Sequence, residues 1–151
     1  MSTTATETAR EQSVAGQQSE IGEPIQTNTE LRSIRDIIKD LSKPVAKRHL
    51  KQRKQGNIML DYISWYDAVK YLDHYAPGWT YEIRSIQTVA GKLILTTRIT
   101  IPCLEGEVFR EATGQEDETC DSFGDSSSNA ESMSLRRASA KFGLGLYLYE
   151  K

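Results

Sequence analysis

Apolar residues recur at two different periods along this chain, and each change of period predicts a change of secondary structure. The first periodic segment starts at Thr29 with helical spacing and stops before Pro44, which restricts the residue preceding it. Its apolar members are Leu31, Ile34, Ile37, Ile38 and Leu41. After Gly56 the segment IMLDYIS alternates instead, as a half-buried strand does. Its alternating apolar positions are Ile58, Leu60 and Tyr62.

A second helical segment has signals at both of its ends. Ser64 stands three residues before Asp67, as in a capping box, and Pro77-Gly78 ends the pattern. The residues expected to share its buried face are Trp65, Ala68, Val69, Leu72 and Ala76. We expect this to be the clearest helix of the chain.

Three strands are expected after this helix. They cover residues 81–86, 92–101 and 107–113, and turns are predicted at Ala90-Gly91 and at residues 104–106. The middle strand has the strictest alternation, which places on one face Leu93, Leu95, Thr97, Ile99 and Ile101. The three strands therefore form an antiparallel meander.

The last helix is predicted at residues 129–142, after an acidic, solvated loop at residues 114–129. On a helical wheel its packing side holds Leu135, Ala138, Ser139 and Phe142. The opposite arc, which we expect to face outward, holds the cations Arg136, Arg137 and Lys141. Gly143 and Gly145 follow the helix, and we interpret them as a helix stop and a tight packing point.

These elements predict an α+β fold. It has an antiparallel β-sheet with a β-α-β-β-β-α core, backed by helices, and an additional N-terminal helix. Residues 1–28 are polar and have no apolar period, so we expect a disordered tail there. Residues 29–151 have the length of one domain.

Charge is distributed unevenly, although the 151 residues carry a net charge of only −2. Residues 42–60 contain no acid and the cations Lys43, Lys47, Arg48, Lys51, Arg53 and Lys54. Residues 104–131 are acidic apart from Arg110. A domain built from these segments has surfaces of opposite sign, and the basic one favours an anionic partner.

The hydropathy and the cysteine content of the chain indicate in which cellular compartment the protein lies. The mean hydropathy is −0.53, and no apolar run approaches the ~18 residues that span a bilayer. Because the first residues also lack the order of a signal peptide, we expect a cytoplasmic protein with no membrane partner. Cys103 and Cys120 lack the companions of a zinc site, and we interpret them as reduced thiols.

No arrangement of residues in the sequence predicts catalysis. His49 and His74 have no nucleophile at motif spacing, so we interpret both as solvated. The acidic segment EDETCDSFGD could hold Mg²⁺ as in a nuclease, but Ser122 stands where a calcium loop needs glycine. We therefore predict no enzyme, no cofactor and no bound metal, with a metal-dependent nuclease as an alternative.

Two cationic segments far apart in the chain each lie next to aromatic residues. The first comprises Arg48, Lys51, Arg53 and Lys54, followed by Tyr62. The second comprises Arg136, Arg137 and Lys141, followed by Phe142 and Tyr147. Phosphates need several cations along one track, and unstacked bases need flat π faces. If the strand and the last helix pack together, these residues line one nucleic-acid groove; alternatively, Tyr147 and Tyr149 are core residues and the cations are only solvated.

Two stretches of the sequence are recognisable. The segment "LSKPVAKRHLKQRKQGNIMLDYISWYDAVKYLDHYAPGWTYEI" resembles the start of the core domain in the Rad52 superfamily of single-strand annealing proteins. We expect a bacterial or phage member of that superfamily. The closing segment "LRRASAKFGLGLYLY" resembles the end motif of that family. The resemblance covers roughly residues 31–149, and its two ends are more specific than the sheet between them.

The resemblance implies a nucleoid-associated recombination protein. It would bind single-stranded DNA in a basic groove around an oligomeric ring and promote annealing of complementary strands without ATP. Its DNA-binding positions would fall on Arg53, Tyr62, Arg136 and Arg137 in this sequence. The third helix cation of the family aligns with Ala140, and the charge stands at Lys141 instead, about 100° further around the helix.

Three other functions remain open from the sequence. A double-stranded RNA-binding module has the same order of helix, three strands and basic helix, but it leaves the N-terminal helix and the basic segment unexplained. A metal-dependent nuclease would use the acidic loop, and a scaffold would assemble through its edge strands alone. A preference for single strands over duplexes would distinguish the annealing protein from the RNA-binding module. Activity that requires Mg²⁺ would favour the nuclease, and a protein that binds no nucleic acid would be a scaffold.

Overall fold

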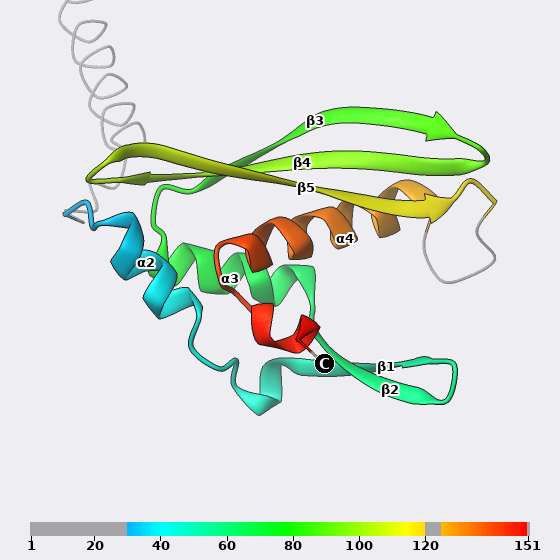
Figure 1. Cartoon of the computed structure of the whole chain (residues 1–151), viewed down its shortest axis with the longest axis horizontal. Helices are drawn as coiled ribbons and strands as arrows, with labels where there is room; N and C mark the ends of the chain where they lie inside the picture. Colours follow the sequence, from blue (N-terminus) through cyan, green and yellow to red (C-terminus); the bar gives the residue numbers. More distant parts are fainter. Residues whose placement is uncertain (1–29, 120–124, 151) are drawn as a thin grey trace, which may run out of the picture. The chain divides into compact units, whose positions relative to one another are not determined.

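A computed structural model describes residues 30–119 and 125–150 (Figure 1). The predicted tail and Cys120 lie outside these residues. The first described helix, α2, spans Ile34–Leu41, and Ser33 caps it by accepting a hydrogen bond from the Asp36 backbone N–H. It starts later than the sequence pattern predicts, and Ile37 and Leu41 enter the core as expected.

The basic segment forms a strand that the sequence analysis did not predict. After a short 3₁₀ helix, η1 (Lys47–His49), strand β1 (Leu50–Gln55) pairs antiparallel with β2 (Ile58–Ile63), which confirms the predicted strand. The turn between them contains Gly56, whose φ of +64° favours glycine. Almost all of β1 is exposed, so its conformation depends on pairing with β2 rather than on burial of an apolar face.

Helix α3 (Trp65–Tyr75) begins where predicted. The Ser64 hydroxyl accepts a hydrogen bond from the Asp67 backbone N–H at 3.3 Å, and Ala68, Leu72 and Ala76 are fully buried. The prediction for Trp65 was wrong, since 49% of its surface is exposed. Trp65 is the first residue of the helix and lies against Tyr66 at the rim of a cavity, not against the core.

Three long strands form the second sheet, in the order β3-β4-β5. These are β3 (Thr80–Val89), β4 (Lys92–Cys103) and β5 (Gly106–Asp117), all antiparallel as predicted and all longer than predicted. The predicted turn at Ala90-Gly91 is confirmed and has a positive φ at both residues. The alternation of β4 is also confirmed, and its buried residues are Leu95, Thr97, Ile99, Ile101 and Cys103.

Helix α4 (Ser126–Lys141) packs against β4 and β5 (Figure 1). A Cβ added at Gly114 of β5 would lie 1.9 Å from the Ala130 carbonyl oxygen, so glycine permits the close approach. The helix begins at its cap Asp125 and β5 continues to Asp117, so the predicted loop at residues 114–129 was too long at both ends. Residues 120–124 lie outside the described part of the loop.

The end of α4 confirms the predicted role of the glycines. Gly143 has a φ of +103°, and the backbone N–H groups of Gly143 and Leu144 donate to the last free carbonyls of the helix. A Cβ at Gly143 would lie 2.2 Å from the Ser42 hydroxyl oxygen. The 3₁₀ helix η2 (Leu146–Tyr149) then follows.

The described residues thus form an α+β fold with two antiparallel sheets and three α-helices. The order is helix, two strands, helix, three strands, helix, which adds one strand to the predicted order. The core lies between the three-stranded sheet and the helices, and it includes Leu41, Leu72, Ile99, Ile101 and Phe142. None of the described helices is both long enough and apolar enough to cross a bilayer.

Candidate nucleic-acid interface

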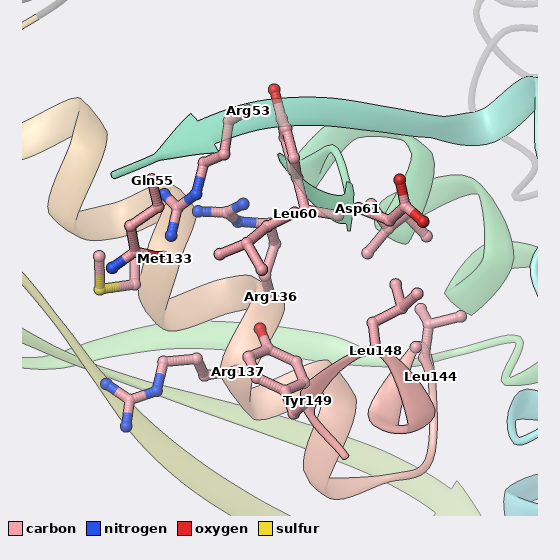
Figure 2. Close-up of a pocket in the computed structure, with 13 residues that line it drawn as sticks. Arg53, Gln55, Leu60, Asp61, Met133, Arg136, Arg137, Leu144, Leu148 and Tyr149 are labelled. Carbon is pink, nitrogen blue, oxygen red and sulfur yellow. The ribbon is translucent and has the colours of Figure 1, made fainter. Parts of the chain in front are cut away.

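A cavity of about 360 Å³ lies between the β1-β2 hairpin and the C-terminal half of α4 (Figure 2). Its polar lining includes Arg53 from β1, Tyr62 from β2, and Arg136 and Arg137 from α4. Its apolar lining includes Leu60, Met133, Leu144 and Leu148. We call this hollow the arginine cavity. It joins residues from the two segments whose convergence the sequence analysis predicted.

The guanidinium group of Arg136 is the central feature of the arginine cavity. It lies over the Tyr62 ring, 5.2 Å from the centroid, and its Nε donates to the Ser132 carbonyl oxygen at 3.2 Å. Figure 2 shows the guanidinium groups of Arg53 and Arg136 turned toward each other. Burial lowers the pKa of Arg136, and the positive charge of Arg53 acts in the same direction. Two cations are therefore held together in a partly desolvated hollow.

Figure 2 shows the carboxylate of Asp61 turned away from the guanidinium groups of Arg53 and Arg136. Asp61 lines the cavity and accepts a hydrogen bond from Gln52 Nε2 at 3.1 Å. Two cations held close together repel each other and attract negative charge, so the arginine cavity is suited to an external anion.

Arg137 occupies the edge of the arginine cavity. Its guanidinium points away from Arg53 toward the sheet (Figure 2) and donates to the Thr113 carbonyl oxygen at 3.0 Å. The expected outward position of Arg137 is confirmed by its exposure, but part of its hydrogen-bonding capacity serves β5. Arg136, in contrast, is half-buried rather than facing outward, because the hairpin covers that side of α4.

Four predicted site residues lie outside the arginine cavity; Lys51 lines a neighbouring hollow, and the other three are Arg48, Lys54 and Lys141. Lys54 pairs with Met59 in the hairpin, one position along from Arg53, so it projects from the opposite face of β1. Arg48 is exposed on η1. Lys141 donates from its Nζ to the Glu111 carbonyl oxygen at 2.6 Å, again along β5. The structure does not bring these three cations to the Arg53–Arg136 pair.

A second cavity of about 250 Å³ adjoins the first. It shares Arg53, Tyr62 and Arg136 with the arginine cavity and extends to Lys51 and Trp65. Its lining also includes Tyr66, Ser64 and Ser132, and we call it the tryptophan cavity. Lys51 is thus the one predicted cation that lies in this second hollow but not in the first.

Comparison with known proteins agrees with this geometry. The sequence model of the family described as "Rad52/22 family double-strand break repair protein" matches residues 33–151. This chain belongs to that family. The Rad52/22 match includes the hairpin, the three-stranded sheet and α4, and therefore both sides of the arginine cavity.

Two Rad52-like relatives from Arabidopsis thaliana show how far the similarity extends. The chain is 33% identical over 122 residues to "DNA repair RAD52-like protein 1, mitochondrial", which covers 80% of the chain and 69% of that relative. It is 36% identical over 124 residues to "DNA repair RAD52-like protein 2, chloroplastic", which covers 80% of the chain and 62% of that relative. The chain is thus similar to proteins named for DNA repair. Its predicted bacterial or phage origin stays a prediction.

Three aromatic residues that the sequence analysis did not assign to a site line the arginine or the tryptophan cavity, namely Trp65, Tyr66 and Tyr149. Tyr149 is 57% exposed in the arginine cavity, so it is not the core residue of the alternative interpretation. Tyr147 uses its hydroxyl oxygen to accept a hydrogen bond from the Val45 backbone N–H at 3.0 Å. Phe142 is fully buried, as its place on the wheel predicted. Trp65 and Tyr66, which line the tryptophan cavity, follow the Ser64 cap directly. Two adjacent aromatic residues in the first turn of a helix were the sequence signal that could have identified them as site residues.

The described residues give no support to a metal centre. Within residues 30–119 and 125–150, the structure has no group of three or more metal-ligating side chains. Cys103 is buried and free, and its thiol donates to the Gly106 carbonyl oxygen at 3.2 Å. Burial raises the pKa of this thiol. His49 is half-buried and bonded to the Tyr71 hydroxyl at 2.8 Å, so it is not the solvated residue that we predicted.

Proposed function

We propose that this Rad52/22 protein binds single-stranded DNA through the arginine cavity and promotes annealing of complementary strands in recombination and repair. It does so without ATP and without a catalytic group, so it is not an enzyme. One observation supports this most strongly: Arg53 and Arg136 come from distant segments of the chain and their guanidinium groups meet in one hollow, beside the Tyr62 ring. Arginines bind phosphates without reading sequence, as an annealing protein requires.

The size of the cavity favours a flexible single strand. A volume of about 360 Å³ is near the lower end for small-ligand pockets, which are ~300–1,000 Å³. It therefore accommodates a short part of a strand, which continues over the surface to the next protomer. A single strand is flexible enough to follow such a path, whereas duplex DNA is stiff over about 150 base pairs. Bases that stay outside the cavity can pair with a second strand, and base pairing supplies the free energy of annealing.

The sheet edges support assembly into an oligomeric ring. Part of the β5 edge is occupied, since Arg137 and Lys141 donate to the carbonyl oxygens of Thr113 and Glu111. Strand β3 pairs with β4 on one side, and it carries exposed apolar residues, namely Tyr81, Ile83, Ile86 and Val89. An unpaired edge with apolar side chains is a site for association with another chain. We propose that a different surface of a second copy packs along β3, in a head-to-tail contact that repeats around a ring.

The compartment is part of the same proposal. We propose a cytoplasmic, nucleoid-associated protein, although the two relatives are named mitochondrial and chloroplastic. Fractionation of source cells with an antibody against the chain would test this, and an organelle fraction would contradict it.

A strand-annealing assay tests the function. Two complementary oligonucleotides, one with a fluorophore and one with a quencher, are mixed with the protein in EDTA and without ATP. The proposal predicts faster annealing, tighter binding to the single strand than to its duplex, and a mass by light scattering of several protomers.

Each rival function has its own contradicting result. Preference for double-stranded RNA would indicate the RNA-binding module. Strand cleavage that requires Mg²⁺ would indicate a nuclease. Oligomers that bind no nucleic acid would indicate a scaffold.

A further inference from the structure

The tryptophan cavity carries aromatic surface that phosphate binding does not explain. Trp65 is 49% exposed and Tyr66 is 42% exposed, although both belong to the first turn of a well-capped helix. Large aromatic side chains are usually buried, so an exposed adjacent pair beside a cationic hollow indicates a ligand with its own flat surface. The hollow that they line reaches Arg53 and Arg136 directly.

The two rings are held in a defined arrangement. Their centroids are 5.8 Å apart and their planes are nearly perpendicular, at 83°. Lys51 Nζ lies 5.4 Å from the centroid of the Tyr66 ring, and a hydrogen bond from Lys51 is the main cause of a lowered Tyr66 pKa. Tyr66 is therefore covered by a cation on one side and packs against Trp65 on another. This arrangement fixes the indole while half of its surface stays open.

We propose that Trp65 is a stacking platform for one unpaired nucleobase per protomer, with Tyr66 and Lys51 holding the indole in place. This inference rests on the proposed binding of single-stranded DNA. A phosphate at the Arg53–Arg136 pair places its attached nucleotide beside the tryptophan cavity, since both cavities share those two side chains. Every base has a π face, so the platform is independent of sequence.

Stacking also suits annealing chemically. It uses the face of the base and leaves the hydrogen-bonding edge free to test a second strand. A base in a duplex is already stacked on both faces by its neighbours, so the indole also distinguishes single strands from duplexes. The platform thus adds selectivity to an arginine pair that contacts phosphates alone.

The experiment compares two oligonucleotides of equal length, oligothymidine and an abasic strand with the same phosphates. Trp65→Ala is expected to weaken binding to oligothymidine at least about fivefold and to leave binding to the abasic strand unchanged. Trp65→Phe, which keeps a π face, is expected to restore most of the loss. Phe109→Ala serves as the matched control, because Phe109 is 54% exposed on β5 outside both cavities.

Tryptophan fluorescence gives a second readout. The chain has two tryptophans, and Trp79 donates from Nε1 to Asp73 Oδ1 at 2.6 Å, outside both cavities. In a Trp79→Phe variant, oligothymidine is expected to quench the remaining emission, and the abasic strand is not.

The outcomes separate the stacking inference from the proposed function. Unchanged oligothymidine binding by Trp65→Ala, together with weaker binding by Arg53→Gln, overturns the stacking role and leaves the function intact. Equal losses on both strands show that Trp65 acts structurally and also overturn it. If the unmodified protein binds neither strand, the proposed function itself fails.

Discussion

Adjacent cations on strand β1 provide a sensitive test of which face binds DNA. Arg53 lines both cavities, whereas Lys54 projects from the opposite face of the same strand. Both side chains are exposed, so Arg53→Gln and Lys54→Gln remove one positive charge each with little expected effect on folding. Any difference in DNA binding between the two variants therefore shows on which face of β1 the DNA lies, because the net charge of the two variants is the same.

The magnitude follows from the number of cations in the two cavities, which are Lys51, Arg53, Arg136 and Arg137. For single strands the slope of log K against log salt is about −0.7 per neutralised phosphate, so four contacts give about −2.8 per protomer. From 50 to 200 mM salt the affinity of the unmodified protein then falls by about fiftyfold. Without Arg53 the slope becomes about −2.1, and the affinity falls by about eighteenfold.

The assay is fluorescence anisotropy of a labelled oligothymidine at several salt concentrations. Because each protomer loses one contact in four, the slope falls by about a quarter however many protomers the strand crosses. Lys54→Gln is expected to keep the slope of the unmodified protein. An Arg53→Gln variant with an unchanged slope, or a Lys54→Gln variant with the lower slope, would refute the assignment of the groove face.

Three further predictions concern how the sheet and α4 are held together. Gly114→Ala should destabilise the protein by about 3 kcal/mol in urea unfolding, because the new Cβ meets the Ala130 carbonyl; unchanged stability would contradict the packing. Thr97→Val should cost about 1 kcal/mol by removing the buried 2.6 Å bond to the Ser134 hydroxyl, and no loss would contradict it. The backbone N–H of Ser128 donates to the Asp125 carboxylate and lowers the pKa of that carboxyl. The stability that the carboxylate contributes is therefore complete above its ordinary pKa of 3.8 and disappears as pH falls through the lower pKa of the folded protein. Urea titrations of Asp125→Ala should show a weaker acid dependence than those of the unmodified protein, and an equal dependence would contradict the cap.

The strands and helices that bury one face could be predicted from the sequence. The alternation of β4 and the wheel of α4 both reflect contact with a single core, so periodicity located Ile99, Ile101 and Ala138 correctly. Strand β1 escaped prediction because the sequence LKQRKQ has no apolar face. A Gly56-Asn57 turn before an alternating strand was the signal for it, and that signal depends on a partner strand rather than on burial.

The candidate site could be predicted only in part. Charge clustering identified Arg53 and Arg136, since cations without neighbouring acids need an external anion. Spacing alone could not separate Arg53 from Lys54, because that distinction requires the register of a strand that was not expected. It also could not show that Lys141 would bond to a β5 carbonyl, which depends on how α4 crosses the sheet.

The most direct test of the account is a structure of the oligomer bound to oligothymidine. The account predicts a strand that runs between the β1-β2 hairpin and α4, with phosphate oxygens within hydrogen-bonding distance of Arg53 and Arg136. A strand that instead follows the face of the three-stranded sheet away from α4, clear of both arginines, would contradict it.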